Sequence, residues 1–570
     1  YSLIAVLLAG LSGCASFAPK VETQAAKPAV AAEDDFNVEM LPKLELSDEM
    51  VLRFLVGDIA AQRGNPALAA QAWHDLAKRT QDPRIAQRAT QLSLAAGQLT
   101  LAQESAQLWV VGAPRSIAAR QLLVSLLIRS KRLDQLEPHI YAMLNAKPQE
   151  MAPFFMQMHQ LWDKDSDRQA VLRITEQVSE GHLEMAEARF ARAVAQSNAA
   201  NDSAALAELD AALALRPTWE PAVLYKAQLM AGKDPVAVEK LLQAAAQANP
   251  MSSKITLAQA RNAAESRQYE TAQRLYEGVL LKEPHHIEAL IGAGLVALEL
   301  NDNLKAQAHL ERAVAINPKS APTLAIYLGQ IAEQQHRDAE AIKWYRQVLE
   351  EQQDRVTPRL PRLYARTGDQ AAADAALAAL PSATNDEQIN KVQIEAQVWR
   401  ERKQLQKGYD VLSAALLRFP AAAELFYDRS LFADLLGNYA AAEADLLRYL
   451  ELEPGQAQGL NALGYILANR TDRYLEADTY LSKALKLEPN NPVILDSMGW
   501  LRFKQGKLSE ALSLLERAYG LLPDAEVAAH YAEALWQKGD QAKAKQLILD
   551  ASKQSPDDEA VLTLRKKLGL

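Results

Sequence analysis

Cys14 is the only cysteine among the 570 residues, and it closely follows an apolar run from Ser2 to Leu11. A single thiol cannot form a disulfide within the chain, and a thiol in this setting is not expected to be a catalytic nucleophile. The apolar run is too short to span a bilayer and is typical of the hydrophobic part of a secretory signal. Because the chain opens at Tyr1 without Met or a basic segment, we expect residues 1–13 to be a truncated signal peptide.

No other group of residues has the spacing of a catalytic or metal site. The sequence contains no Gly-x-Ser-x-Gly elbow, no Walker-type phosphate loop and no His-Glu-x-x-His motif. His285 and His286 are adjacent in a turn, and adjacent turn residues do not converge on one metal ion. Glu288 and Glu299 suit the solvated face of a helix better than an acid–base pair. The sequence therefore predicts no catalytic site, no metal site and no cofactor.

Nucleic acid is not an expected partner. The chain has 62 basic and 71 acidic residues and a formal charge of −9, whereas affinity for nucleic acid depends mainly on basic contacts to phosphate. The cluster Arg565-Lys566-Lys567 is short, and we interpret it as solubilising. Binding to other proteins is the class of function that remains.

The elements that position these residues follow from a regular spacing of prolines. Near the end of the chain the intervals are 34, 35, 34 and 33 residues, and upstream they are 33, 34 and 34. A fixed period of this length is typical of stacked helical repeats, and strand signals are nearly absent. The sequence therefore predicts an all-α solenoid of about fifteen helical pairs between Glu49 and Pro556. The two series of prolines are Pro420, Pro454, Pro489, Pro523 and Pro556, and Pro217, Pro250, Pro284 and Pro318.

The residues between the prolines resemble the tetratricopeptide repeat (TPR), a helix–turn–helix unit of about 34 residues. Gly499, Ala511 and Pro523 match the small, Ala and Pro positions of that repeat, and Gly464 and Gly294 fill the small position in two other units. Small residues let two helix backbones approach, and proline ends the second helix. The resemblance implies a right-handed superhelix in which each unit buries its apolar faces against the next.

The periodicity divides the chain into segments. Ser47, Asp48 and Glu49 provide a cap and an acidic first turn for the first helix. The expected segments are a lipid-modified cysteine and flexible tether over 14–47, divergent TPR-like pairs over 48–182, a TPR array over 183–353, an irregular joint over 354–386, a regular TPR array over 387–556 and a C-terminal capping helix over 557–570.

The TPR resemblance also implies where a partner binds, because the first helix of each pair lines the concave groove in that family. In the best-matched units the groove positions carry aromatic and hydrogen-bonding side chains, which suit a protein surface. Packing of the same Trp and Tyr against the adjacent repeat is an equal alternative. The mixed charges do not match the Lys/Arg-rich clamp with which chaperone-binding TPR domains hold a terminal carboxylate. The candidates are Asn461, Tyr465, Asn469, Asp496, Trp500, Phe503, Lys504, Glu533 and Trp536.

Leu11-Ser12-Gly13-Cys14 resembles the lipobox of bacterial lipoproteins. The resemblance implies cleavage before Cys14 and lipidation of its thiol, with acyl chains sufficient for stable anchoring. Ala15 and Ser16 follow, and neither is the Asp associated with retention in the inner membrane. The expected location is the outer membrane, facing the periplasm.

Over its whole length the chain resembles the large TPR outer-membrane lipoproteins of pseudomonads and related proteobacteria. That resemblance implies an adaptor for a periplasmic serine protease of the carboxyl-terminal processing type. Such an adaptor binds and activates the protease and delivers substrates such as peptidoglycan hydrolases.

Two other functions stay open at this point. The same surface suits an assembly factor for pili, exopolysaccharide export or outer-membrane barrels. An enzyme acting on peptidoglycan would need a convergent polar constellation, which the sequence does not contain.

Overall fold

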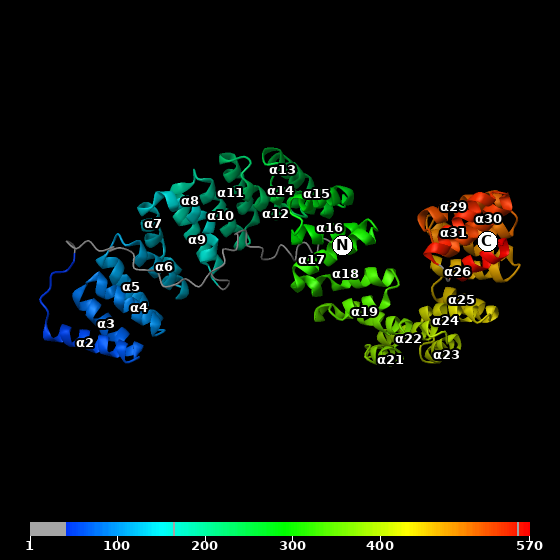
Figure 1. The fold of residues 1–570 in the computed structure, drawn as a ribbon, viewed down its shortest axis with the longest axis horizontal. Helices are drawn as coiled ribbons and strands as arrows, with labels where there is room; N and C mark the ends of the chain where they lie inside the picture. Colours follow the sequence, from blue (N-terminus) through cyan, green and yellow to red (C-terminus); the bar gives the residue numbers. More distant parts are fainter. Residues whose placement is uncertain (1–40, 163–165, 556–557, 570) are drawn as a thin grey trace. The chain divides into compact units, whose positions relative to one another are not determined.

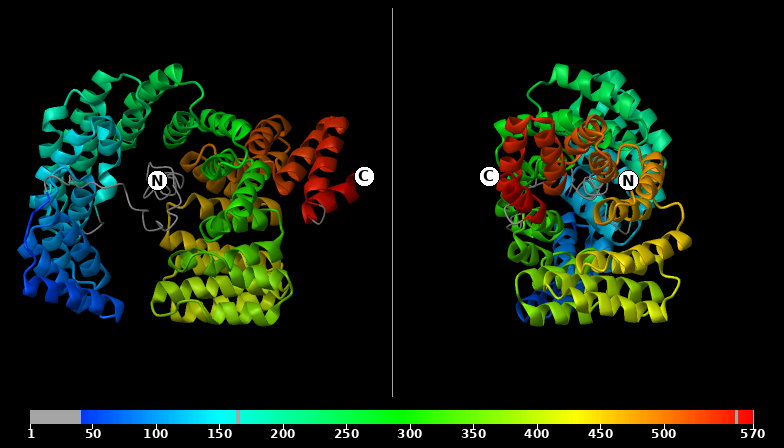
Figure 2. Two further views of the ribbon diagram at one scale, coloured as in Figure 1. Left: turned by 60° about the vertical axis from the view of Figure 1, so that its left-hand side comes forward. Right: turned by 90° about the vertical axis from the view of Figure 1, so that its right-hand side faces the viewer.

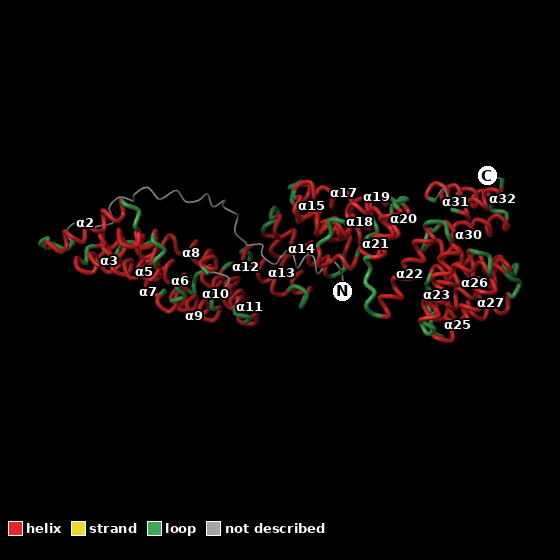
Figure 3. The backbone as a smooth tube through the Cα atoms, turned by 90° about the horizontal axis from the view of Figure 1, so that it is seen from below, coloured by secondary structure: helices red, strands yellow, loops and turns green. Residues whose placement is uncertain are grey.

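The computed structural model describes residues 41–162, 166–555 and 558–569, and these residues form helices and turns without any β-strand (Figure 1, Figure 3). The expected all-α solenoid is thereby confirmed. The chain divides into two compact units between Ile316 and Asn317. The expected signal peptide, Cys14 and most of the expected tether lie outside the described residues. None of the described helices is long and apolar enough to cross a membrane.

The first unit contains sixteen described α-helices, with four short 3₁₀ helices between α6 and α10. The α-helices are α2 (Asp48–Gln62), α3 (Pro66–Thr80), α4 (Pro83–Ala95), α5 (Leu99–Gly112), α6 (Ile117–Arg129), α7 (Glu137–Ala146), α8 (Met151–Gln157), α9 (Arg168–Ser179), α10 (Ala186–Asn198), α11 (Asp202–Leu215), α12 (Glu220–Met230), α13 (Pro235–Ala248), α14 (Ser253–Glu265), α15 (Tyr269–Lys282), α16 (Ile287–Glu299) and α17 (Asn303–Ile316). The 3₁₀ helices are η2 (Leu133–Gln135), η3 (Pro148–Glu150), η4 (Met158–Leu161) and η5 (Glu180–His182).

The second unit contains fifteen described α-helices. They are α18 (Ala321–Gln334), α19 (Asp338–Tyr345), α20 (Leu360–Arg366), α21 (Gln370–Ala378), α22 (Asn385–Glu401), α23 (Leu405–Arg418), α24 (Ala423–Leu435), α25 (Tyr439–Leu452), α26 (Ala457–Arg470), α27 (Tyr474–Leu487), α28 (Pro492–Lys504), α29 (Leu508–Leu521), α30 (Ala525–Lys538), α31 (Gln541–Gln554) and α32 (Glu559–Leu568). The 3₁₀ helices are η6 (Pro318–Ser320), η7 (Glu350–Arg355) and η8 (Thr357–Arg359). Taken in order from α2, the helices of both units make fifteen pairs, followed by α32.

Each helix packs mainly against the next helix and the next but one (Figure 2). One helix pair cannot bury both of its apolar stripes, so the core is a series of small clusters between neighbouring pairs. The longest cluster runs from Ala60 in α2 to Ala191 in α10. Stability therefore comes from contacts that are local along the chain.

The periodic prolines end the second helices as expected. In all eight described cases the helix stops two residues before the proline, as at Leu487 before Pro489 and Leu521 before Pro523. The residue that precedes proline cannot easily adopt helical angles, and Glu488 accordingly has φ −131° and ψ 78°. Pro556, the ninth proline of the two series, lies outside the described residues.

The small residues lie at close contacts between helices, as the sequence predicts. A Cβ atom on Gly499 would lie 2.7 Å from Cγ of Leu515, and one on Gly464 would lie 2.6 Å from Cγ of Leu481. Gly292 in α16 is covered in the same way by the ring of Tyr276. These contacts confirm that the glycines allow close packing of two helices.

Most turns inside the pairs contain one left-handed residue. It directly follows the C-cap in most pairs, and it is Gly in some turns, such as Gly506 with φ 77°, and Ala200 or Lys403 in others. We expect Gly506→Ala to lower the free energy of unfolding by about 1 kcal/mol, because an L-residue is strained there. The measurement is urea denaturation of the full chain followed by circular dichroism.

Gly520→Ala is the matched control for that prediction. Gly520 lies inside α29 and is exposed, and a Cβ atom added to it would have no neighbour within 4 Å. Alanine is the better helix former, so this substitution should leave stability unchanged or raise it by up to about 1 kcal/mol. If Gly506→Ala and Gly520→Ala lower the free energy of unfolding equally, the left-handed conformation at Gly506 is not the cause of the loss.

Side-chain caps begin several of the helices. Ser47 caps α2 by accepting a hydrogen bond of 3.3 Å from the backbone N–H of Met50. The segment 354–386 contains η8 and the short helices α20 and α21, which turn at Gly368. Thr384 then begins α22 with a capping box to Glu387.

Candidate protein-binding site

The first helices of three consecutive pairs, α26, α28 and α30, lie next to one another in the second unit. The second helices α27, α29 and α31 pack behind them. Because first helices of adjacent pairs touch, side chains at equivalent positions one repeat apart come together. All nine groove candidates lie on α26, α28 and α30.

Asp496 of α28 and His530 of α30 form a buried ion pair. Nδ1 of His530 lies 2.9 Å from Oδ2 and 3.1 Å from Oδ1 of Asp496, and both side chains are almost inaccessible to solvent. Away from water each group needs the hydrogen bond that the other supplies.

The pKa of His530 is raised above its usual value. Burial is the largest single influence and lowers the pKa, but the carboxylates of Asp496, Glu526 and Glu533 together raise it by more. The protonated imidazole is therefore favoured in the folded chain.

The indole of Trp500 covers this pair. Its ring stacks on His530 with centroids 4.1 Å apart and on Phe503 with centroids 5.0 Å apart. Its Nε1 donates a hydrogen bond of 3.1 Å to Oδ1 of Asn469, and the ammonium of Lys504 lies 4.9 Å from its ring centroid. An aromatic face next to cationic groups is a favourable arrangement.

Tyr465 links α26 to α30. Its hydroxyl donates a hydrogen bond of 2.8 Å to Oε1 of Glu526 on α30 and accepts one of 3.1 Å from Nδ2 of Asn469. Burial, followed by the charge of Glu526, raises the pKa of Tyr465, so the phenol stays protonated and keeps donating. The bond to Glu526 spans 61 positions and so reaches across a whole repeat.

The nine candidates fall into three groups by exposure. Asn461, Asp496 and Trp500 are buried, so they pack between helices instead of facing solvent. Tyr465, Asn469, Phe503, Glu533 and Trp536 are half-buried, and Lys504 is exposed.

The network does not include every candidate. Oδ1 of Asn461 is buried without a hydrogen-bond partner. Glu533 forms an ion pair with Lys567 of α32. The ring centroid of Trp536 lies 5.9 Å from the ammonium of Lys545 on α31.

The sequence interpretation missed His530 and Glu526, which complete the network. The repeat period could have identified His530, because it lies 34 residues after Asp496 and so takes the equivalent position in the next unit. Nothing comparable marks Glu526 in the sequence.

A second cluster has the residue types of a hydrolase triad. Nδ1 of His74 lies 2.8 Å from Oγ of Ser105, and Nε2 lies 3.2 Å from Oε2 of Glu104. Burial and the neighbouring Lys78 lower the pKa of His74. Ser105 is completely buried, so no substrate can reach its hydroxyl, and we interpret this cluster as structural.

Helix α2 in the first unit presents a different kind of surface. Among the described helices it packs substantially only on α3, with Phe54 against Trp73 at a centroid distance of 5.3 Å. Six of its apolar side chains are exposed, including Leu52 at 60 % and Leu55 at 49 %. They are Val51, Leu52, Phe54, Leu55, Val56 and Ile59. Exposed apolar side chains grouped on one helix are typical of an interaction site.

Stacked helix pairs of this kind define a class of protein, the α-solenoid that binds other proteins. Family models described as tetratricopeptide repeat match residues 257–321, 292–355, 457–491 and 502–568. The TPR repeat-containing protein PA4667 of Pseudomonas aeruginosa is 30% identical over 534 residues, which cover 92% of this chain and 88% of the relative. The chain belongs to the tetratricopeptide repeat proteins.

Matches among solved structures include the Cut9–Hcn1 hetero-tetramer of the APC/C. It is 15% identical with a TM-score of 0.30, and the match covers 90% of this chain and 89% of that one. The thermophilic TPR protein TTC0263 of Thermus thermophilus is 18% identical with a TM-score of 0.29, and the match covers 31% of this chain and 98% of that one.

Proposed function

We propose that this TPR protein is a non-catalytic adaptor of the bacterial cell envelope. It binds and activates a periplasmic serine protease of the carboxyl-terminal processing type and delivers protein substrates, such as peptidoglycan hydrolases, to it. Lipidation at Cys14 anchors it to the outer membrane. The observation that carries the proposal is the exposed apolar face of α2.

An adaptor needs separate surfaces for two proteins, and the chain offers two of different chemistry. The α2 face is apolar and belongs to the first unit, whereas the face of α26, α28 and α30 is polar and aromatic and belongs to the second. Holding two proteins on one chain raises the effective concentration of each for the other.

The α2 face has the properties expected of an anchor for the protease. Phe54 is fixed by its edge contact with Trp73, so little side-chain freedom is lost when a partner covers it. The surrounding Leu, Val and Ile side chains gain roughly 25 cal/mol for each Å² that the partner removes from water.

The test is a binding measurement with the purified carboxyl-terminal processing protease of the same bacterium. The probe protein is the chain from Ala15 onwards, and the variant is Leu52→Asp with Leu55→Asp. We expect Kd to rise about 100-fold, because two desolvated apolar contacts are each replaced by a charge. Cleavage of a hydrolase substrate by the protease should fall in parallel.

Leu475→Asp is the matched control. Leu475 is 84 % exposed in α27, so the same chemical change is made on a surface outside the α2 face. Its Kd should equal that of the unaltered chain. Failure of the unaltered chain to bind the protease would refute the adaptor function. Full binding by the Leu52→Asp, Leu55→Asp variant would show that the protease does not bind to the α2 face.

A further inference from the structure

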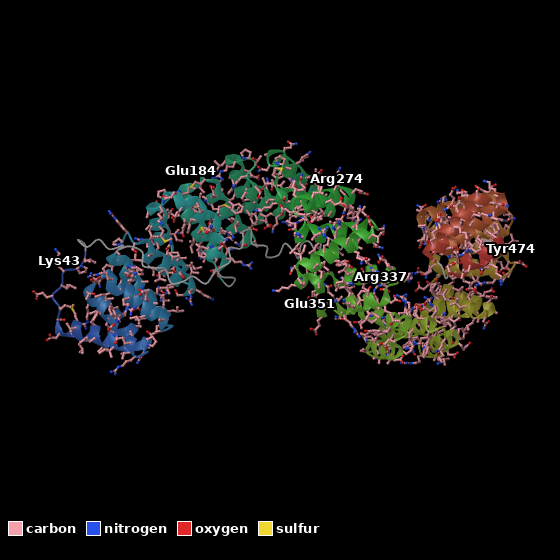
Figure 4. All side chains as sticks on the ribbon, viewed as in Figure 1. Lys43, Glu184, Arg274, Arg337, Glu351 and Tyr474 are labelled. Atoms are coloured by element: carbon pink, nitrogen blue, oxygen red, sulfur yellow. The ribbon has the colours of Figure 1, made fainter. Side chains whose placement is uncertain are left out.

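The second unit contains a polar pocket that the face of α26, α28 and α30 does not include. The pocket has a volume of about 480 Å³, within the range of ligand-binding pockets. Four stretches of chain form it: α18 through Glu333, the segment from η7 to α20, α22 and α24. The side chains that matter are Arg355, Arg359, Arg362, Gln393, Gln397 and Asp428. Figure 4 labels Glu351, which lies in η7, the 3₁₀ helix that ends at Arg355.

One wall of the pocket is cationic. Arg355 ends η7, Arg359 ends η8 and Arg362 lies in α20, so successive short elements of the chain supply them. Two of their charges are already balanced, because Arg359 lies 3.0 Å from Glu333 and Arg362 lies 3.2 Å from Glu401. Arg355 is exposed and has no ion pair in the described part of the chain, so it is available for an anion.

A second wall consists of side-chain amides on α22. Nε2 of Gln393 donates a hydrogen bond of 2.7 Å to Oδ2 of Asp428. Oε1 of Gln397 is buried and accepts no hydrogen bond. Since buried acceptors are normally satisfied, this oxygen lacks an N–H donor that a ligand can supply.

Asp428 restricts the ligand further. Burial raises the pKa of its carboxyl group, and the hydrogen bond from Gln393 opposes that rise. Its negative charge limits how much negative charge a ligand can bring into the pocket, so a single carboxylate suits the pocket better than a phosphate dianion. Ile394 adds an apolar contact on the amide wall.

We propose that this pocket binds an extended peptide segment that carries a carboxylate. The carboxylate pairs with the guanidinium of Arg355, and a backbone N–H of the peptide donates to Oε1 of Gln397. The carboxylate is an Asp or Glu side chain or the end of the peptide chain. This proposal rests on the proposed function and specifies the kind of segment that a delivered substrate presents.

The test is selection of peptides by the chain from Ala15 onwards. The probes are two displayed libraries of random heptapeptides. In one library each peptide has a free carboxyl terminus, and in the other each peptide is joined at both ends to the displaying protein. We expect one of two results. Either Asp or Glu is enriched at one position of the selected peptides, or peptides with a free carboxyl terminus are selected whatever their last residue is. The best peptide is then measured by fluorescence polarisation. Arg355→Glu should lower the affinity for this peptide at least tenfold. Arg355→Lys keeps the positive charge and should lower the affinity less.

Arg173→Glu in α9 is the control with the same charge change, because Arg173 is exposed on the other unit. It should leave the affinity unchanged. Replacing the acidic residue by its amide, or amidating the terminus, shows which carboxylate is bound. Failure to select any peptide would overturn the proposal. Equal affinity of Arg355→Glu and the unaltered chain for the best peptide would also overturn it.

The protease assay separates this proposal from the adaptor function. Arg355→Glu leaves the α2 face intact, so it should bind the protease as the unaltered chain does. Loss of protease binding in the α2 variant with peptide binding retained would show that the two sites act separately.

Discussion

Tyr276→Ala should lower the free energy of unfolding of the region around α15 and α16 by about 3–5 kcal/mol, as expected for loss of a large buried aromatic ring. The ring is completely buried and fills the space opposite Gly292, where no Cβ could fit. Alanine would leave a cavity that the two backbones cannot close. The measurement is native-state hydrogen exchange of α15 and α16, because a long repeat array need not unfold in one step.

Tyr276→Phe is the matched variant and should behave in the opposite way. The hydroxyl of Tyr276 is buried without a hydrogen-bond partner, and the same burial raises its pKa. Removing an unsatisfied polar group is neutral or stabilising, so exchange should be unchanged or slower. A large loss of protection in Tyr276→Phe would mean that the hydroxyl is bonded in solution.

Asp496→Asn should destabilise α28 and α30 by about 3 kcal/mol near pH 6, because it removes one partner of a buried ion pair. The effect should depend on pH. Since the folded pKa of His530 is raised, its pairing stabilises the fold fully below the unfolded pKa of about 6.5 and is lost as pH rises through the folded pKa. The difference between unaltered chain and variant should therefore shrink from pH 6 to pH 9.

The measurement is urea denaturation at several pH values, with hydrogen exchange to locate the change in α28 and α30. The groups facing His530 are Asp496 on α28 and Glu526 and Glu533 on its own helix, and Trp500 covers the ring. Asp410→Asn, an exposed aspartate on α23, is the control and should show no such pH dependence. A pH-independent loss in Asp496→Asn would mean that His530 is neutral in the folded chain.

The sequence was sufficient for the fold because the TPR signals act locally. Proline excludes helical angles at the preceding residue, and glycine at positions 464 and 499 permits contacts that any larger residue would block. Such constraints operate within one unit, so a period of 34 residues reveals them without knowledge of distant contacts.

The candidate site was only partly predictable because its residues are shared between units. Position in the repeat identified Trp500 and Asp496, but only the packing of α30 shows that both are buried and that His530 joins them. Helix α2 was not singled out, because its apolar residues read as core until the structure shows that mainly α3 covers it. The Arg355 pocket lies where the period fails, so repeat-based reasoning had no register there.

The predominantly short-range packing also has a consequence for how such a gene can change. A helix pair that touches little beyond its neighbours can be duplicated or deleted as a unit, and the rest of the array closes around the edit. The bond from Tyr465 to Glu526 is different, because it bridges an entire intervening unit. Insertion of one repeat between them would separate the two side chains and break this hydrogen bond, so the segment 465–526 tolerates such an edit less well than its neighbours do.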